Sequence, residues 1–179
     1  MSREKTLFKN TIIITIGKIA TQMITFFLLP LYTAILSTEE YGTVDLLNTL
    51  ISLLLPIVTF QVEQALFRFL IDNRENKEEI QNNISSAFFS VILQSVVYLA
   101  IFFLISPLVH NDYKYFLAIN VIVYIFASLT QQISRGFGKN THFAISSFLA
   151  AFTTIIFNII FLIPLRWGAN GMLLANMLG

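Results

Sequence analysis

One stretch near the N-terminus constrains the fold more than any other: residues 11–33 are almost entirely apolar and carry a single formal charge, Lys18. At about 1.5 Å per residue, a helix of this length can cross a hydrocarbon core of roughly 30 Å. Its polar residues recur at steps of three and four, and they are Thr11, Thr15, Lys18, Gln22 and Thr25. On a helix they fall within an arc of about 80°. Such a stripe is typical of a membrane helix that lines a polar interior.

The composition indicates an integral membrane protein. Of the 179 residues 56% are hydrophobic and only 12% are charged, whereas soluble domains carry about 25% charged residues. The chain has no cysteine, which excludes disulfides, thiolate metal sites and cysteine nucleophiles. His110 and His142 form no metal-ligand spacing. The 11 basic residues are spread thinly along the chain, so the net charge of +1 gives no indication of a nucleic-acid partner. We expect no nucleic-acid partner, cofactor, metal or catalytic residue.

Apolar runs separated by polar turns predict an all-α integral membrane fold, with five complete transmembrane helices and the start of a sixth. The predicted spans are residues 11–36, 44–70, 84–109, 115–134, 143–165 and, incomplete, 172–179. Pro56 lies inside the second span and is expected to kink it. The last run is too short to cross a bilayer. We therefore expect the sequence to be the N-terminal portion of a longer protein.

The distribution of basic residues predicts the orientation, because cytoplasmic loops carry an excess of Lys and Arg. With the N-terminus inside, the inner ends hold Arg3, Lys5, Lys9, Arg68, Arg74, Lys77, Arg135 and Lys139. The outer turns then hold only Lys114 and Arg166. We therefore expect a multi-pass membrane protein with a cytoplasmic N-terminus.

Two further spans repeat the polar stripe. In the second span it consists of Asp45, Asn48, Thr49, Ser52, Thr59 and Glu63. In the fourth span it consists of Asn120, Tyr124, Ser128, Gln131 and Arg135. The alternative interpretation of these stripes is that their Ser, Thr and Asn side chains join membrane helices to one another by hydrogen bonds, as such residues commonly do. Long stripes on three helices, two of them with charges at depth, favour a shared polar cavity.

Several short motifs, taken in order, resemble a known transporter family. They are Asn10, Gly17, the run Pro30-Leu31-Tyr32-Thr33, the turn Leu36-Ser37-x-Glu39-Glu40-Tyr41-Gly42, the run Glu63-Gln64-Ala65-Leu66-Phe67-Arg68-Phe69, the turn Arg135-Gly136-x-Gly138-Lys139, and Gly168-Ala169-Asn170-Gly171. Their order and spacing resemble the start of polysaccharide-transporter flippases. These form the O-antigen (Wzx-type) branch of the multidrug/oligosaccharidyl-lipid/polysaccharide exporter superfamily.

The resemblance implies a fold of two six-helix bundles around a central cavity, of which this chain would supply most of the first bundle. It implies a flippase that moves a polyprenyl-diphosphate-linked oligosaccharide, such as an O-antigen, capsule or exopolysaccharide repeat unit, by alternating access across a bacterial or archaeal cytoplasmic membrane. The implied partners are this lipid-linked substrate, membrane lipid, a sodium ion or proton as coupling ion, and the second bundle. Many relatives carry Arg or Lys at the position of Gln22 and Arg at that of Ala34.

The stripes supply the candidate site residues. The predicted substrate-binding residues are Lys18, Gln22, Asn48, Ser52, Asn120, Tyr124 and Gln131, and the predicted ion-coupling residue is Glu63. Lys18 would attract the diphosphate; its alternative role is to snorkel to the inner interface. Lys18 and Glu63 lie at matching depths on consecutive spans, so we expect them to share the inner half of the cavity.

Three alternatives to a flippase remain. The first is a multidrug or organic-cation exporter of the same superfamily, which an acidic cavity would favour. The second is a membrane-embedded glycan transferase, which needs a carboxylate pair, a His-Asp dyad or a metal site at a cavity mouth. The third is an inactive truncated product. Because nothing beyond His110 and Asp112 in one short turn supports catalysis, we expect a transporter and not an enzyme.

Overall fold

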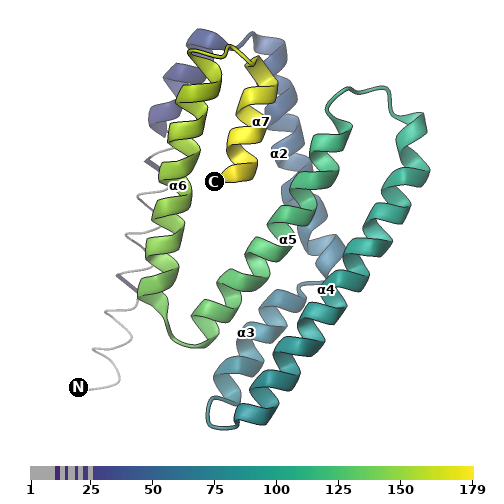
Figure 1. Ribbon diagram of the computed structural model, residues 1–179, viewed down its shortest axis with the longest axis vertical. Helices are drawn as coiled ribbons and strands as arrows, with labels where there is room; N and C mark the ends of the chain where they lie inside the picture. Colours follow the sequence, from purple (N-terminus) through teal and green to yellow (C-terminus); the bar gives the residue numbers. More distant parts are fainter. Residues whose placement is uncertain (1–10, 13–14, 16–18, 20–21, 24–25) are drawn as a thin grey trace. The chain divides into compact units, whose positions relative to one another are not determined.

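The computed structural model describes residues 11–12, 15, 19, 22–23 and 26–179, and these form helices without a strand. The helices are α2 (Thr38–Thr59), α3 (Val62–Asp72), α4 (Lys77–Ile105), the 3₁₀ helix η1 (Ser106–Leu108), α5 (Lys114–Gly136), α6 (Asn140–Leu162) and α7 (Gly168–Leu178) (Figure 1). Four segments are long and apolar enough to cross a membrane: Thr38–Thr59, Lys77–Leu108, Lys114–Gly136 and Thr141–Leu162. A shorter apolar helix covers Phe26–Ile35. The predicted all-α membrane fold is confirmed.

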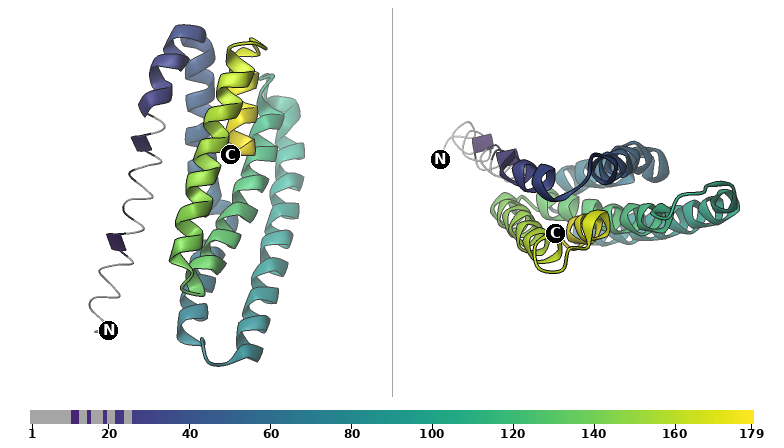
Figure 2. Two further views of the ribbon diagram at one scale, coloured as in Figure 1. Left: turned by 60° about the vertical axis from the view of Figure 1, so that its left-hand side comes forward. Right: turned by 90° about the horizontal axis from the view of Figure 1, so that it is seen from above.

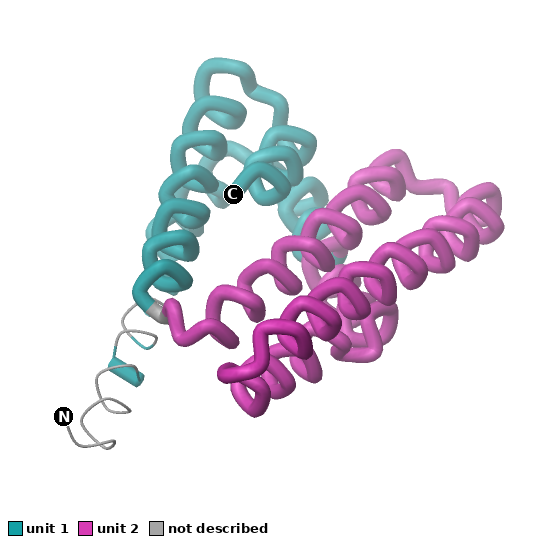
Figure 3. Tube along the Cα trace, turned by 60° about the horizontal axis from the view of Figure 1, so that its bottom comes forward, with its two compact units in different colours: residues 1–46, 140–179 teal, residues 47–139 magenta. Residues whose placement is uncertain are grey.

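The chain divides into two compact units, which are described separately. Unit 1 comprises residues 1–46 and 140–179, and unit 2 comprises residues 47–139 (Figure 3). Helix α2 begins in unit 1 and ends in unit 2.

Unit 2 is held together by an apolar core between α3, α4 and α5, to which the second half of α2 contributes Ile51. The other buried members of the core are Leu66, Leu70, Ala87, Val91, Tyr98, Val121, Ile125 and Leu129. On α5 the core residues recur every fourth position, so they form one stripe along the helix. Gly136 lets α3 approach α5 closely, because a Cβ at this position would lie 2.7 Å from Cδ1 of Leu70.

Unit 1 contains the pair α6 and α7, which lie side by side in both views of Figure 2. Leu162 and Leu173 are buried in this unit. The ring of Phe161 stacks on Trp167 in the connecting turn, with 5.1 Å between the ring centroids. Gly171 leaves room for this turn, because a Cβ there would lie 2.9 Å from Cβ of Phe161.

The start of α2 in unit 1 is capped by a reciprocal pair of hydrogen bonds. Ser37 Oγ accepts from the N–H of Glu40 at 3.2 Å, and the Glu40 carboxylate accepts from the N–H of Ser37 at 2.9 Å. This is a capping box, which satisfies two backbone donors that the helix itself cannot. The same carboxylate also accepts from the N–H of Ala169 in the first turn of α7. One acidic side chain therefore caps two helices of unit 1.

Two helix ends differ from the ends of the predicted spans, one because of a capping side chain and one because of a proline. Helix α4 begins at Lys77 instead of residue 84, because the Asn76 side chain accepts hydrogen bonds from the N–H groups of Glu78 and Glu79. Helix α6 ends at Leu162 instead of residue 165, two residues before Pro164, which disfavours helical geometry in the residue before it. A hydropathy pattern locates the apolar part of a helix, whereas its ends depend on these local hydrogen bonds.

The largest difference lies in the second span. The single kinked helix expected over residues 44–70 is replaced by α2 and α3, separated at Phe60 and Gln61. Both residues have left-handed backbone angles, with φ of 46° and 56°. We call this interruption the Phe60–Gln61 break. It comes four residues after Pro56, which keeps α-helical geometry inside α2.

Candidate functional site

The Phe60–Gln61 break is fixed by hydrogen bonds on the side of α2. Thr59 Oγ1 donates to the carbonyl of Leu55 at 3.0 Å and accepts from the N–H of Gln61 at 3.1 Å. The Gln94 side chain on α4 donates through Nε2 to the carbonyl of Thr59 at 3.1 Å. A left-handed conformation costs a non-glycine residue roughly 1–2 kcal/mol. These bonds satisfy polar groups that the broken helix would otherwise leave unpaired.

The break places a carboxyl group inside unit 2. Glu63 lies in the first turn of α3 and is only 5% exposed. It shares one face of the short helix with Leu66 and Leu70, which belong to the apolar core. Its Oε2 atom is buried and has no hydrogen-bond partner within the part of the chain that the structure describes.

The surroundings of Glu63 decide which chemistry it can perform. The helix dipole favours a negative charge in the first turn of α3. Burial of the Oε2 atom without a hydrogen-bond partner works in the opposite direction, because a buried polar atom that lacks a partner costs free energy. The structure thus places the predicted ion-coupling residue in a buried position at the start of α3.

Three further buried polar atoms lie on α4, near the middle of the longest span. Gln94 Oε1, Ser95 Oγ and the Tyr98 hydroxyl are buried and have no hydrogen-bond partner among the described residues. Sequence reasoning assigned none of them a role. Gln94 could have been found, because it is the only amide or charged side chain between residues 84 and 109. A lone glutamine in such a run needs a partner inside the protein, and here it is the carbonyl of Thr59.

A cationic group lies at the far end of α5. Arg135 Nη1 donates to Gln132 Oε1 at 3.0 Å, and the Arg135 guanidinium lies 4.8 Å from the centroid of the Phe67 ring on α3. Cation–π contacts of this kind stabilise a structure by roughly 0.5–2 kcal/mol. The predicted stripe of the fourth span included Arg135 but not its hydrogen-bond partner Gln132. Gln132 is buried and lies three residues before Arg135 in the sequence.

The predicted substrate-binding residues on α2 and α5 of unit 2 differ in exposure. Asn48 is half-buried and Ser52 is exposed on α2, where Ser52 donates to the carbonyl of Thr49 at 2.7 Å. On α5, Tyr124 and Gln131 are exposed, whereas Asn120 is only 2% exposed and donates to the carbonyl of Phe116 at 2.8 Å. Among the described residues, none of these side chains hydrogen-bonds to another predicted site residue.

The N-terminal part of the predicted site is described only in part. Gln22, in unit 1, is exposed. Lys18 lies outside the described residues, so its predicted pairing with Glu63 stays a prediction. No group of three or more His, Cys, Asp and Glu residues that could hold a metal occurs in the described ranges.

Comparison with known proteins identifies a family. The model of the family described as "Polysaccharide biosynthesis protein" matches residues 7–178, nearly the whole chain. No curated protein and no solved structure matches the chain.

Proposed function

Because the chain belongs to the polysaccharide biosynthesis protein family, we propose that it moves a lipid-linked oligosaccharide across the cytoplasmic membrane. The substrate would be a polyprenyl-diphosphate-linked repeat unit of an O-antigen, capsule or exopolysaccharide. The chain would form one helical bundle of the transporter, facing a second bundle across the substrate path, with its N-terminus in the cytoplasm. It would act as a flippase by alternating access and not as an enzyme.

The observation that carries this proposal is Glu63. A buried carboxyl group, one oxygen of which has no hydrogen-bond partner among the described residues, at a break in a membrane helix is unusual for a helix that only anchors a protein. Acidic residues buried inside membrane proteins commonly bind the proton or ion that drives transport. Glu63 would bind the coupling proton or sodium ion. The exposed polar residues Ser52, Tyr124 and Gln131 would contact the sugar or diphosphate.

The test is deletion of the gene that encodes this chain in its own cell. The lipid-linked repeat unit should then accumulate in the inner leaflet, where an impermeant sugar-oxidising reagent does not reach it in spheroplasts. Restoring the gene should return labelling to the original level. If deletion leaves both surface glycan and the labelled fraction unchanged, the chain does not supply this translocation step.

A further inference from the structure

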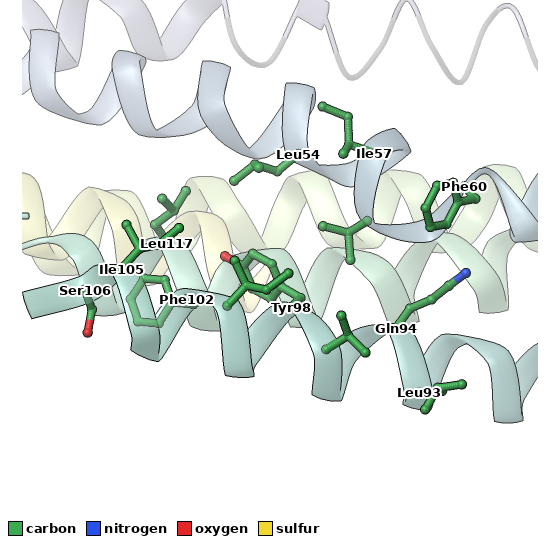
Figure 4. Close-up of a pocket in the computed structure, with 13 residues that line it drawn as sticks. Leu54, Ile57, Phe60, Leu93, Gln94, Tyr98, Phe102, Ile105, Ser106 and Leu117 are labelled. Carbon is green, nitrogen blue, oxygen red and sulfur yellow. The ribbon is translucent and has the colours of Figure 1, made fainter. Parts of the chain in front are cut away.

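Unit 2 contains a groove that the transport proposal leaves without a role. It encloses about 540 Å³ and runs along α4, between that helix and the second half of α2 (Figure 4). Its walls are almost wholly apolar, with Leu54, Ile57, Val97, Ile101 and Phe102 among the lining side chains. All five belong to segments that are long and apolar enough to cross a membrane, and Ile57 and Ile101 are exposed.

The length of the groove suits one hydrocarbon chain. The lining residues extend from Leu93 on α4 to Ser106 at the start of η1, which corresponds to roughly 20 Å along a helix. Half of a bilayer's hydrocarbon core is about 15 Å thick, and a single lipid chain fills this depth. Gln94 lies toward the end of the groove opposite Ser106, and Tyr98 lies between the two (Figure 4).

A cation lies at the Ser106 end. Lys114 Nζ donates to the carbonyl of Ser106 at 2.8 Å and to that of Val109 at 2.9 Å. An ammonium group has three donors, so one remains for a further acceptor. Asp112 is exposed in the same turn, and Lys114 takes no part in the ion pair between Arg68 and Asp72. The charge of Lys114 is therefore not neutralised by a carboxylate among the described residues.

An aromatic side chain connects this cation to the groove. The Lys114 ammonium lies 5.6 Å from the centroid of the Tyr115 ring, and that ring packs edge-on against Phe102, a lining residue, at 6.2 Å. Tyr is enriched at membrane–water interfaces, where its ring contacts hydrocarbon and its hydroxyl contacts water. The Ser106 end of the groove thus has a cation and an aromatic ring, as in a lipid headgroup region, and the largely apolar lining of the remainder, apart from Gln94 and Tyr98, suits a lipid tail.

We propose that the groove binds one acyl chain of an anionic phospholipid whose phosphate group contacts Lys114. A zwitterionic lipid offers the same chain but a weaker headgroup interaction. One lysine near an anionic lipid surface strengthens binding about fivefold. The site concerns resident membrane lipid and is independent of whether the protein transports an oligosaccharide.

The experiment is quenching of tryptophan fluorescence by brominated lipid chains. Trp167, the only tryptophan, is replaced by Phe, and Phe102→Trp places the reporter in the groove. The full chain is reconstituted into phosphatidylcholine vesicles that contain rising fractions of dibrominated phosphatidylglycerol or dibrominated phosphatidylcholine. Ile101→Trp, also a lining position, replaces Phe102→Trp if the latter does not fold.

Phe103→Trp is the matched control, because Phe103 is one residue away at the same depth, is exposed, and does not line the groove. For tryptophan at position 102, the quenching should show that the groove binds phosphatidylglycerol about fivefold more strongly than phosphatidylcholine. At position 103 the two lipids should quench alike. Lys114→Gln should remove the preference at position 102, and Lys114→Arg should retain it.

Three results would overturn the proposal. Absence of quenching at position 102, with normal quenching at 103, means that protein and not lipid occupies the groove. Equal quenching by both lipids at position 102 means that bulk lipid enters without recognition of its headgroup. A preference that survives Lys114→Gln means that Lys114 does not bind the phosphate.

Discussion

The side chain of Gln94 on α4 hydrogen-bonds to the main-chain carbonyl of Thr59, at the residue where α2 ends. This contact joins residues 35 positions apart and lies at the Phe60–Gln61 break. It ties the break to the longest helix of unit 2. The bond therefore fixes the segment from which α3, and with it Glu63, begins.

Replacement of Gln94 by Leu tests this bond. The carbonyl of Thr59 would lose its donor, which costs roughly 1–3 kcal/mol for a buried group. The change also removes the unpaired Gln94 Oε1, so we expect a loss of about 1 kcal/mol, at the lower end of that range. Thermal unfolding in detergent measures it. Gln131→Leu, at an exposed position of α5, is the control, and equal melting temperatures for the two variants would contradict the assigned role of Gln94.

Replacement of Gln61 by Gly tests the break itself. Gln61 is exposed and has left-handed backbone angles, φ 56° and ψ 33°, which glycine adopts without the roughly 1–2 kcal/mol that other residues lose. Gln61→Gly should therefore leave the melting temperature unchanged or raise it, and Gln61→Val should lower it. In a continuous helix the glycine would instead destabilise by roughly 0.5–1 kcal/mol. A lower melting temperature for Gln61→Gly than for Gln61→Val would support that continuous helix.

The sequence predicts the membrane helices well, because each apolar run is itself the physical requirement for crossing a bilayer. It does not predict the break. Pro56 is visible in the sequence, yet α2 continues past it and ends only where Gln94 supplies a donor from another helix. A bond of this kind depends on how α2 and α4 pack in the folded protein. A local periodicity in the sequence gives no information about that packing.

The candidate site is predicted less completely for the same reason. The polar stripe of the second span assumed a constant rotation per residue from Asn48 to Glu63. Two residues with left-handed backbone angles lie between them, so the angular positions expected for one regular helix do not apply beyond the break. On α5 the stripe is a single face, but Asn120 is buried while Gln131 is exposed. Spacing alone shows which residues share a face and not what covers that face.

In unit 1, Glu40→Ala should destabilise the protein. Its carboxylate accepts hydrogen bonds from the N–H groups of Ser37 and Ala169. Loss of a helix cap costs roughly 0.5–2 kcal/mol. We expect a lower melting temperature and faster amide hydrogen exchange at the starts of α2 and α7. Glu39→Ala is the control, because Glu39 is its exposed neighbour in the same first turn. If only α2 exchanges faster, the bond to Ala169 contributes nothing to α7.

The last prediction concerns Glu63, and it distinguishes a coupling residue from a structural one. Glu63→Gln keeps the size and most of the hydrogen-bonding capacity of the side chain but removes the ionisable group. Because the native carboxyl is buried with an unpaired oxygen, removal of its charge should leave the melting temperature unchanged or raise it. Transport should change in a different way. If a proton or sodium ion binds to Glu63 in each cycle, the variant should lose most of the dependence of the transport rate on pH or on sodium.

The measurement is translocation of lipid-linked oligosaccharide in membrane vesicles that contain the complete transporter, over a range of pH and of sodium concentration. Glu75→Gln is the matched control, because Glu75 is an exposed acid in the turn before α4 and should keep the native dependence. Glu63→Asp keeps the charge but shortens the side chain, so it should retain the ion dependence at a reduced rate. A Glu63→Gln protein that folds, and whose transport responds to pH and sodium as the native protein does, would show that Glu63 only stabilises the start of α3.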